Sequence, residues 1–307
     1  MRIIDSHAHF IVKGHPIFPG YADTHGAERA AAVAEQSRRM REDWRRAWRF
    51  PEPEPPSGDI HEIAARWLKD MDQKGVERMV FLTASGNEDM ARIVALAPER
   101  FIGLAYHDIT SKDAARQLER AITSLGLKGL KVFAPLVDVP LSDSSLFPVY
   151  EVAEHYQVPI LIHFGILGGA GGIAWHMNIS PMSIHDAAKA FPRIPFIVPH
   201  FGCGHPRDAL FLAWACPNVH IDTSGSNQWM RFMPYPLTVR DMFLKCRQTI
   251  GAERILFGTD AMTFPRGIVS AYLDSQVRDC VELGFSEQEV DAIFYGNAAR
   301  LYKVEGV

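Results

Sequence analysis

The sequence lacks long hydrophobic runs and any large excess of one charge. Its apolar stretches are short and interrupted by charged residues, whereas a membrane-spanning helix needs roughly 20 apolar residues in a row. The opening MRIIDSHAHF also lacks the apolar core and cleavage site of a signal peptide. The net charge of −4 gives no electrostatic reason to expect a nucleic-acid partner. We therefore expect a cytoplasmic protein that binds neither membranes nor nucleic acids.

Cysteine is scarce and its spacing is uninformative. The 4 cysteines are Cys203, Cys216, Cys246 and Cys280. They are far apart in the sequence and form no C-x-x-C pair. This spacing predicts reduced thiols that act as small hydrophobic residues, and it argues against a disulfide framework or a cysteine-based zinc site.

Short runs rich in Ile, Val, Leu and Phe recur along the chain and alternate with helical patterns. Eight such runs occupy residues 2–5, 78–83, 101–106, 129–133, 158–164, 194–201, 218–223 and 254–260. Runs of this kind are typical of parallel strands that are buried on both faces. The alternation predicts an α/β protein with a (β/α)8 TIM barrel, formed as a single domain over residues 1–307. A doubly wound open sheet is the alternative, but no glycine-rich phosphate loop follows the first run.

Residues 11–58 are too many for one loop after the first strand. They contain the strong helix former AERAAAVAEQSRRMREDWRRAWRF, which the proline-rich PEPEPPSGD ends. We interpret this stretch as a helical insertion within the barrel. Two roles stay open: packing on the barrel or against a second subunit of a homodimer, or a lid that lends an arginine to the barrel mouth. Arg49 and the Arg45/Arg46 pair are the candidates for that arginine.

Polar residues end several of the apolar runs. His7 and His9 are two residues apart, so they project on the same side of a strand. His163, His200 and Asp260 each come at the end of a later run, where barrel enzymes place their chemistry. Imidazole and carboxylate are ligands that zinc prefers, and burying all five groups would be costly without a shared cation. The pattern therefore predicts a divalent metal site.

These motifs resemble the amidohydrolase superfamily. DSHAHF, LIHFG, VPHFG, GTDAMTFPRG and the ending IFYGNAARLY occur in the expected order over nearly the whole chain. The branch they resemble contains aminocarboxymuconate semialdehyde decarboxylase, aromatic-acid decarboxylases, and hydrolases and hydratases of aromatic catabolism. The resemblance implies one Zn²⁺ per chain, with another divalent metal as an alternative. It assigns His7, His9 and His163 as ligands, Asp260 as a ligand or a neighbour of the bound water, and His200 as an acid–base or electrostatic group.

Other residues are candidates for holding a substrate. Lys131 in GLKVF has three interpretations: an ammonium that grips a substrate carboxylate, a structural lysine, or a carbamylated bridge between two metals as in binuclear members of the superfamily. Arg266 is a candidate carboxylate clamp, because guanidinium forms bidentate contacts. The further candidates are His107, Trp175, which would stack on a planar substrate, and Arg49.

The motifs fit more than one reaction. We favour hydrolysis of a small, carboxylated ester, lactone or amide by metal-bound hydroxide, with Asp260 as general base and His200 polarising the carbonyl. The alternative is non-oxidative decarboxylation of an aromatic or muconate-type acid. A third hypothesis is a non-catalytic barrel, although the expected metal ligands are all in place. The substrate itself depends on loop geometry that no motif encodes.

Overall fold

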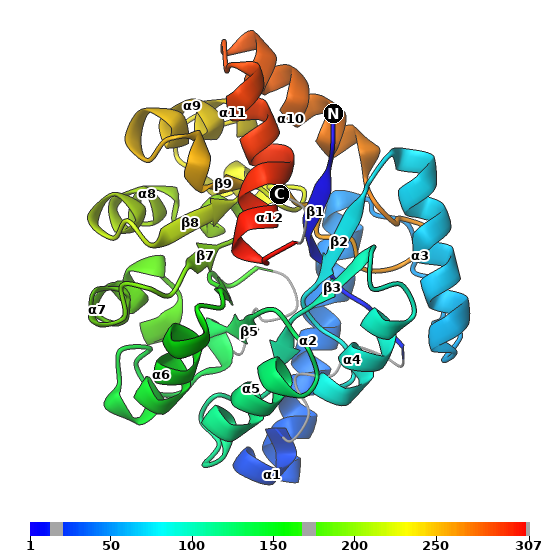
Figure 1. The fold of residues 1–307 in the computed structure, drawn as a ribbon, viewed down its shortest axis with the longest axis vertical. Coiled ribbons are helices and arrows are strands. Elements are labelled where there is room, and N and C mark those ends of the chain that lie inside the picture. Colours follow the sequence, from blue (N-terminus) through cyan, green and yellow to red (C-terminus); the bar gives the residue numbers. More distant parts are fainter. Residues whose placement is uncertain (13–20, 168–175, 305–307) are drawn as a thin grey trace.

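The computed structural model describes residues 1–12, 21–167 and 176–304. Within these ranges the parallel strands form the predicted (β/α)8 barrel, and Figure 1 shows helices arranged around the ring of strands. Three strands pair in chain order in one group: β1 (Ile4–Ala8), β2 (Arg78–Phe81) and β3 (Phe101–Gly103). Six pair in chain order in a second group: β4 (Ala105–Tyr106), β5 (Leu130–Phe133), β6 (Ile160–His163), β7 (Phe196–Val198), β8 (Val219–Asp222) and β9 (Ile255–Leu256). Leu104 separates β3 from β4, which together make the third barrel strand.

The barrel closes where the segment after β9 runs beside β1. Ala8 forms a parallel bridge with Ala261. The backbone N–H of Asp260 donates to the carbonyl of His7 at 2.9 Å, and that of His9 donates to the carbonyl of Ala261 at 2.8 Å. Closure of the barrel therefore brings the first and last of the predicted site motifs together.

Helices cover the outside of the barrel. Their bounds are α1 (Tyr21–His25), α2 (Ala27–Trp48), α3 (Ile60–Lys74), α4 (Asn87–Ala95), α5 (Ala114–Thr123), α6 (Phe147–Tyr156), α7 (His185–Ala190), α8 (Pro206–Ala215), α9 (Val239–Thr249), α10 (Ser270–Glu282), α11 (Glu287–Asp291) and α12 (Asn297–Leu301). Helix α3 illustrates why they form where they do. Asp59 caps its first turn by accepting from the backbone N–H of His61 at 2.8 Å, and Gly75 ends it in the left-handed region. Its buried face includes Trp67 and Met71.

An apolar cluster fills the barrel at the amino-terminal ends of the strands. Its residues in or beside the strands precede the polar residues, as Ile4 precedes His7 and Leu161 precedes His163, and its other members come from the C-terminal helical segment. The cluster comprises Ile4, Val80, Leu82, Ile102, Leu104, Leu161, Ile197, Leu256, Tyr295, Ala298, Ala299, Leu301 and Tyr302. The polar groups are therefore confined to the opposite, carboxyl end of the barrel, where enzymes of this fold have their active sites.

Helices α1 and α2 lie between β1 and α3 in the chain and contact loops at the carboxyl ends of the strands. The His25 imidazole lies 3.2 Å from the Asp108 carboxylate, and Arg29 lies 3.4 Å from Asp138. At the far end of α2, the Arg231 guanidinium lies 4.5 Å from the centre of the Trp48 ring. Among the described helices, none has the length and apolarity to cross a membrane.

His220 is a buried histidine that lies outside the site. It belongs to β8, and burial lowers its pKa to about 3, with smaller contributions from Arg300 and Arg254. A histidine with a depressed pKa stays neutral in the folded protein while the unfolded chain takes up a proton below about pH 6.5. It therefore stabilises the fold fully above that pH, and the stability falls as the pH drops toward 3.

We predict that His220→Gln weakens the acid sensitivity of the fold. Between about pH 7.5 and pH 5, the wild-type free energy of unfolding should fall by about 2 kcal/mol more than that of the variant. Urea unfolding of both proteins at the two pH values measures this difference. Equal losses would show that His220 is protonated normally in the folded state.

Candidate active site

A cavity of about 410 Å³ lies at the carboxyl ends of the strands. Its polar lining from the barrel consists of His7, His9, Lys131, His163, His200 and Asp260. Helix α2 and the loops around it contribute Arg38, Arg41, Arg45 and Arg266, and aromatic walls come from Trp44, Phe50, Tyr106, Phe133 and Phe264. The volume is that of a pocket for one small molecule.

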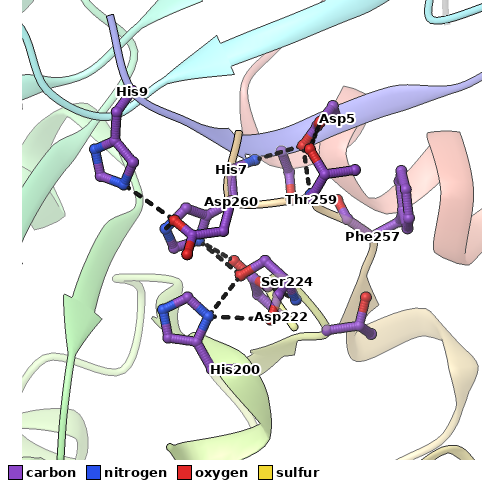
Figure 2. A network of polar contacts seen from close by, with 12 residues as sticks. Asp5, His7, His9, His200, Asp222, Ser224, Phe257, Thr259 and Asp260 are labelled. Atoms are coloured by element: carbon purple, nitrogen blue, oxygen red, sulfur yellow. Dashed lines mark hydrogen bonds and ion pairs between the residues drawn. The ribbon is translucent and has the colours of Figure 1, made fainter. Parts of the chain in front are cut away.

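Three of the predicted ligands are close enough to hold one metal ion. One donor atom from each of His7, His9 and Asp260 lies within 4.8 Å of the others. The Asp260 Oδ1 atom is 3.3 Å from Nε2 of His9 and 3.6 Å from Nε2 of His7, and Figure 2 shows the carboxylate beside these two rings. Asp260 has a left-handed backbone with φ of 57°, and its N–H is held by the His7 carbonyl as described above.

The Nδ1 atoms of His7, in β1, and of His9, directly after it, contact neighbouring side chains. Nδ1 of His7 lies 2.6 Å from Asp222, and Nδ1 of His9 lies 2.7 Å from the Thr83 hydroxyl. A carboxylate only accepts hydrogen bonds, so His7 carries its proton on Nδ1. Its Nε2 lone pair is then directed to the side of Asp260. Contacts of this kind orient metal-binding imidazoles.

The protonation states suit a metal site. Burial lowers the pKa of His7 to about 4, partly offset by Asp222, and burial also lowers the pKa values of His9 and His163. Burial would raise the pKa of Asp260, but its hydrogen bond with His9 and its electrostatic interactions with the His7 and His200 rings hold that pKa well below its usual range. Neutral imidazoles beside an ionised carboxylate are the forms that bind a divalent cation.

His163 lies on the wall of the same cavity but outside the group of three donors. Its Nε2 atom is buried and has no hydrogen-bond partner in the described part of the chain. Its ring centre is 5.2 Å from that of His200. An unsatisfied ring nitrogen in a buried position is costly, and a metal ion in the cavity would satisfy it. The residues present therefore fit the implied metal.

A glycine allows this close packing around His7. A Cβ atom on Gly258 would lie 2.7 Å from the Cβ of His7 and 3.0 Å from the Cβ of Ser224. Any side chain at this position would displace His7. The glycine of the FGTD motif is therefore a packing requirement of the site.

Lys131 projects into the cavity from β5. Its ammonium is buried, has no hydrogen-bond partner in the ranges that the structure describes, and lies 4.6 Å from the centre of the Phe133 ring. Burial lowers its pKa to about 7, against the opposing effect of Asp260 and Asp222. It does not belong to the group of three metal donors.

Of the candidate substrate-binding residues Arg266 and His107, only Arg266 lines the cavity. Arg266 lines the cavity, with its guanidinium 4.6 Å from the centre of the Phe50 ring. His107 is not part of the cavity lining: Nδ1 accepts from Asn87 at 3.3 Å and Nε2 donates to the carbonyl of Ala114 at 3.1 Å.

The two other candidates do not contribute to the described cavity. Arg49 ends α2 in a left-handed conformation and is absent from the described cavity lining, where Arg45 is present instead. Trp175 lies outside the described residues.

Sequence reasoning missed two contributors. Asp222 is buried and contacts His7. The sequence feature that could have indicated it is a second polar side chain within the β8 run VHID. Arg41 lines the cavity, and its signal was the one-turn spacing from Arg45, which places both on one helix face.

Comparisons with known proteins find similarity over nearly the whole chain. The family model described as Amidohydrolase matches residues 4–304. The 2-keto-4-carboxy-3-hexenedioate hydratase of Sphingobium sp. (strain NBRC 103272 / SYK-6) is 25% identical over 98% of this chain and 96% of its own length. The 2-amino-3-carboxymuconate-6-semialdehyde decarboxylase of Dictyostelium discoideum is 33% identical over 25% of this chain and 22% of its own.

A solved structure shows the same fold. The 5-carboxyvanillate decarboxylase of Novosphingobium aromaticivorans, in complex with manganese and 4-hydroxy-3-methoxy-5-nitrobenzoic acid, has a TM-score of 0.66 at 16% identity. The match covers 99% of this chain and 96% of that one.

We predict that His163 contributes to metal binding and that His107 does not. His163→Ala should lower the affinity for Zn²⁺ or Mn²⁺ at least about tenfold, because it removes the unsatisfied nitrogen in the cavity. His107→Ala is the matched control, since both of its nitrogens are engaged elsewhere. Competition with a chromophoric chelator gives both affinities. An unchanged affinity in His163→Ala would remove His163 from the ligand set.

Proposed function

Because this chain belongs to the amidohydrolase family, we propose that it is a metal-dependent carboxy-lyase. The proposed substrate is a small unsaturated or aromatic acid with at least two carboxylates, from which the enzyme releases CO2 without oxidation. The observation that carries this proposal is a set of cations without carboxylate partners around the metal donors.

The cations in question are Lys131, Arg41 and Arg266. All three line the cavity, and in the described residues none has a carboxylate oxygen within 4.0 Å. Other cavity arginines are paired, as Arg45 is with Glu52 at 2.6 Å. Burial lowers the pKa of Arg41 as well as that of Lys131. Lys131 is buried and the two arginines are half-buried. Shielded charges without a carboxylate partner are costly, so an anionic substrate that supplied the carboxylates would be bound favourably.

The relatives support the substrate class. The hydratase acts on a keto acid that is unsaturated and carboxylated, and the decarboxylase on an amino-carboxymuconate semialdehyde. The solved structure holds a substituted benzoic acid. In each case a carboxylate is attached to a small unsaturated or aromatic framework. The aromatic walls formed by Trp44, Phe50 and Phe264 suit a planar molecule of this kind.

We expect His7, His9, His163 and Asp260 to hold one Zn²⁺ per chain, or another divalent cation such as the manganese found in the decarboxylase structure. When bound, such a cation supplies Lewis-acid stabilisation of negative charge on substrate oxygens.

His200 is the proposed proton donor. Its Nδ1 donates to the backbone carbonyl of Ser224 at 3.1 Å, so Nε2 is the atom that exchanges protons. In decarboxylation the carbon–carbon bond breaks, CO2 leaves, and the electron pair stays on the substrate carbon. A second proton, carried on Nε2 when the His200 ring is doubly protonated, then forms the new carbon–hydrogen bond, and solvent returns a proton to Nε2 afterwards. The apolar walls disfavour a charged carboxylate relative to neutral CO2, which assists the cleavage.

Hydrolysis of a carboxylated ester, lactone or amide is the second candidate. The observation that favours it is the ionised Asp260 beside the metal donors, which suits a general base that takes a proton from water. The same cations would bind the carboxylate of such a substrate, so the two reactions differ in the bond broken and not in the binding site.

Product analysis separates these reactions. We predict that the metal-loaded protein releases CO2 from at least one member of a panel of carboxylated benzoates and muconate-type acids. Matched carboxylated lactones should stay intact. Hydrolysis of a lactone without CO2 release would establish the second candidate. Loss of substrate absorbance without CO2 would indicate hydration, and both results would contradict the carboxy-lyase.

Replacing Lys131 by an uncharged residue tests whether it binds a substrate carboxylate. Lys131→Met should raise KM about 10- to 100-fold, because it removes a charge-assisted contact to the substrate. Lys128→Met is the control, since Lys128 is exposed at the opposite end of β5. Steady-state kinetics on the substrate found by the panel gives both values. An unchanged KM in Lys131→Met would show that Lys131 does not bind substrate.

A further inference from the structure

We propose that Ser224 is a positioning residue that joins the metal ligand His7 to the proton donor His200. Its hydroxyl holds both imidazoles in place, while fixed acceptors beside them set the tautomer that leaves their Nε2 atoms for the chemistry. The inference rests on the proposed metal-dependent function for its kinetic consequence, whereas the tautomers can be tested without any substrate.

The Ser224 hydroxyl lies between the two rings. Its oxygen is 3.0 Å from Nδ1 of His7 and 2.9 Å from Nδ1 of His200. Figure 2 shows Ser224 between His200 and the β1 side of the site. The ring centres are 4.9 Å apart and the planes are tilted by 42°. One buried hydroxyl therefore contacts both histidines at once.

Fixed acceptors determine where each proton lies. Asp222 is 2.6 Å from Nδ1 of His7, and the Ser224 carbonyl is 3.1 Å from Nδ1 of His200. Carboxylate and carbonyl oxygens only accept, so both Nδ1 atoms carry hydrogen. Each N–H is shared between its fixed acceptor and the Ser224 hydroxyl oxygen, whose two lone pairs can accept from both rings. Both Nε2 atoms are then left for the metal and the substrate.

The surroundings fix the hydroxyl in place. Ser224 is fully buried, and its backbone N–H donates to Asp222 at 2.5 Å. Its Cβ atom packs against the backbone of Gly258, where no side chain would fit. Asp222 therefore contacts both His7 and the serine that bridges it to His200. The Asp222 carboxylate contacts the His7 ring, whereas the Ser224 hydroxyl contacts the rings of both His7 and His200.

This division of roles predicts different effects for the two residues. Asp222→Asn should weaken divalent-metal affinity about 10- to 100-fold, because it removes the charged acceptor of a ligand histidine. Ser224→Ala should lower kcat about tenfold and change the metal affinity less than about threefold, because Asp222 still orients His7. Ser224→Thr, which restores a hydroxyl, should recover most of kcat.

Ser6→Ala is the matched control. Ser6 is a buried serine next to His7, but its hydroxyl donates to the backbone carbonyl of Phe257 at 2.6 Å. That carbonyl also accepts the Ser6 N–H at 3.0 Å, so it keeps a partner in the variant. Ser6→Ala should therefore match the wild type in kcat and in metal affinity. If Ser224→Ala behaves in the same way, the proposal is wrong.

Nitrogen-15 NMR of the zinc-loaded wild-type protein tests the tautomers directly. Two-bond correlations within the rings distinguish a protonated Nδ1 from an unprotonated one, and His7→Gln and His200→Gln spectra assign the signals. We expect both Nδ1 atoms to be protonated. An unprotonated Nδ1 in either ring overturns the proposal, and this result does not depend on whether Ser224→Ala folds. Protonated Nδ1 atoms in a protein that releases no CO2 would refute the proposed reaction and leave the assignment of Ser224 intact.

Discussion

The contact of the Asp260 carboxylate with the Nε2 atoms of His7 and His9 is the interaction on which the site depends. It exists because the barrel closes between β1 and the segment after β9, where the Asp260 N–H binds the His7 carbonyl. A left-handed residue at Asp260 turns its side chain toward the histidines, and Gly258 leaves room for them. The closure of the fold and the assembly of the metal donors are thus one structural event.

The burial of these groups also sets their chemistry. Burial lowers the pKa values of His7, His9 and His163, and it lowers the pKa of Lys131 to about 7. The same environment strengthens interactions between charges. A carboxylated substrate would therefore gain from the cations Lys131, Arg41 and Arg266, and in return restore the charged form of Lys131. Binding of such a substrate would therefore be coupled to the protonation of this lysine.

The barrel could be predicted from the sequence because it depends on short local patterns, and the same patterns indicated the candidate metal ligands. Apolar runs identified the strands, and the polar residue at the end of a run identified His163 and Asp260. The same signal was misleading for His107, which ends a run but turns to Asn87 and Ala114. Side-chain direction there depends on packing between elements, which no local pattern contains.

The residues supplied by the helical segment were harder to predict. Arginines are frequent along α2, and only the placement of that helix over the barrel selects Arg41 and Arg45 in preference to Arg49.

Anomalous diffraction from crystals grown with Zn²⁺ or Mn²⁺ tests the central claim most directly. The account predicts one peak per chain, within bonding distance of His7, His9 and the Asp260 carboxylate. Two peaks bridged by Lys131, or no peak beside these residues, would contradict it.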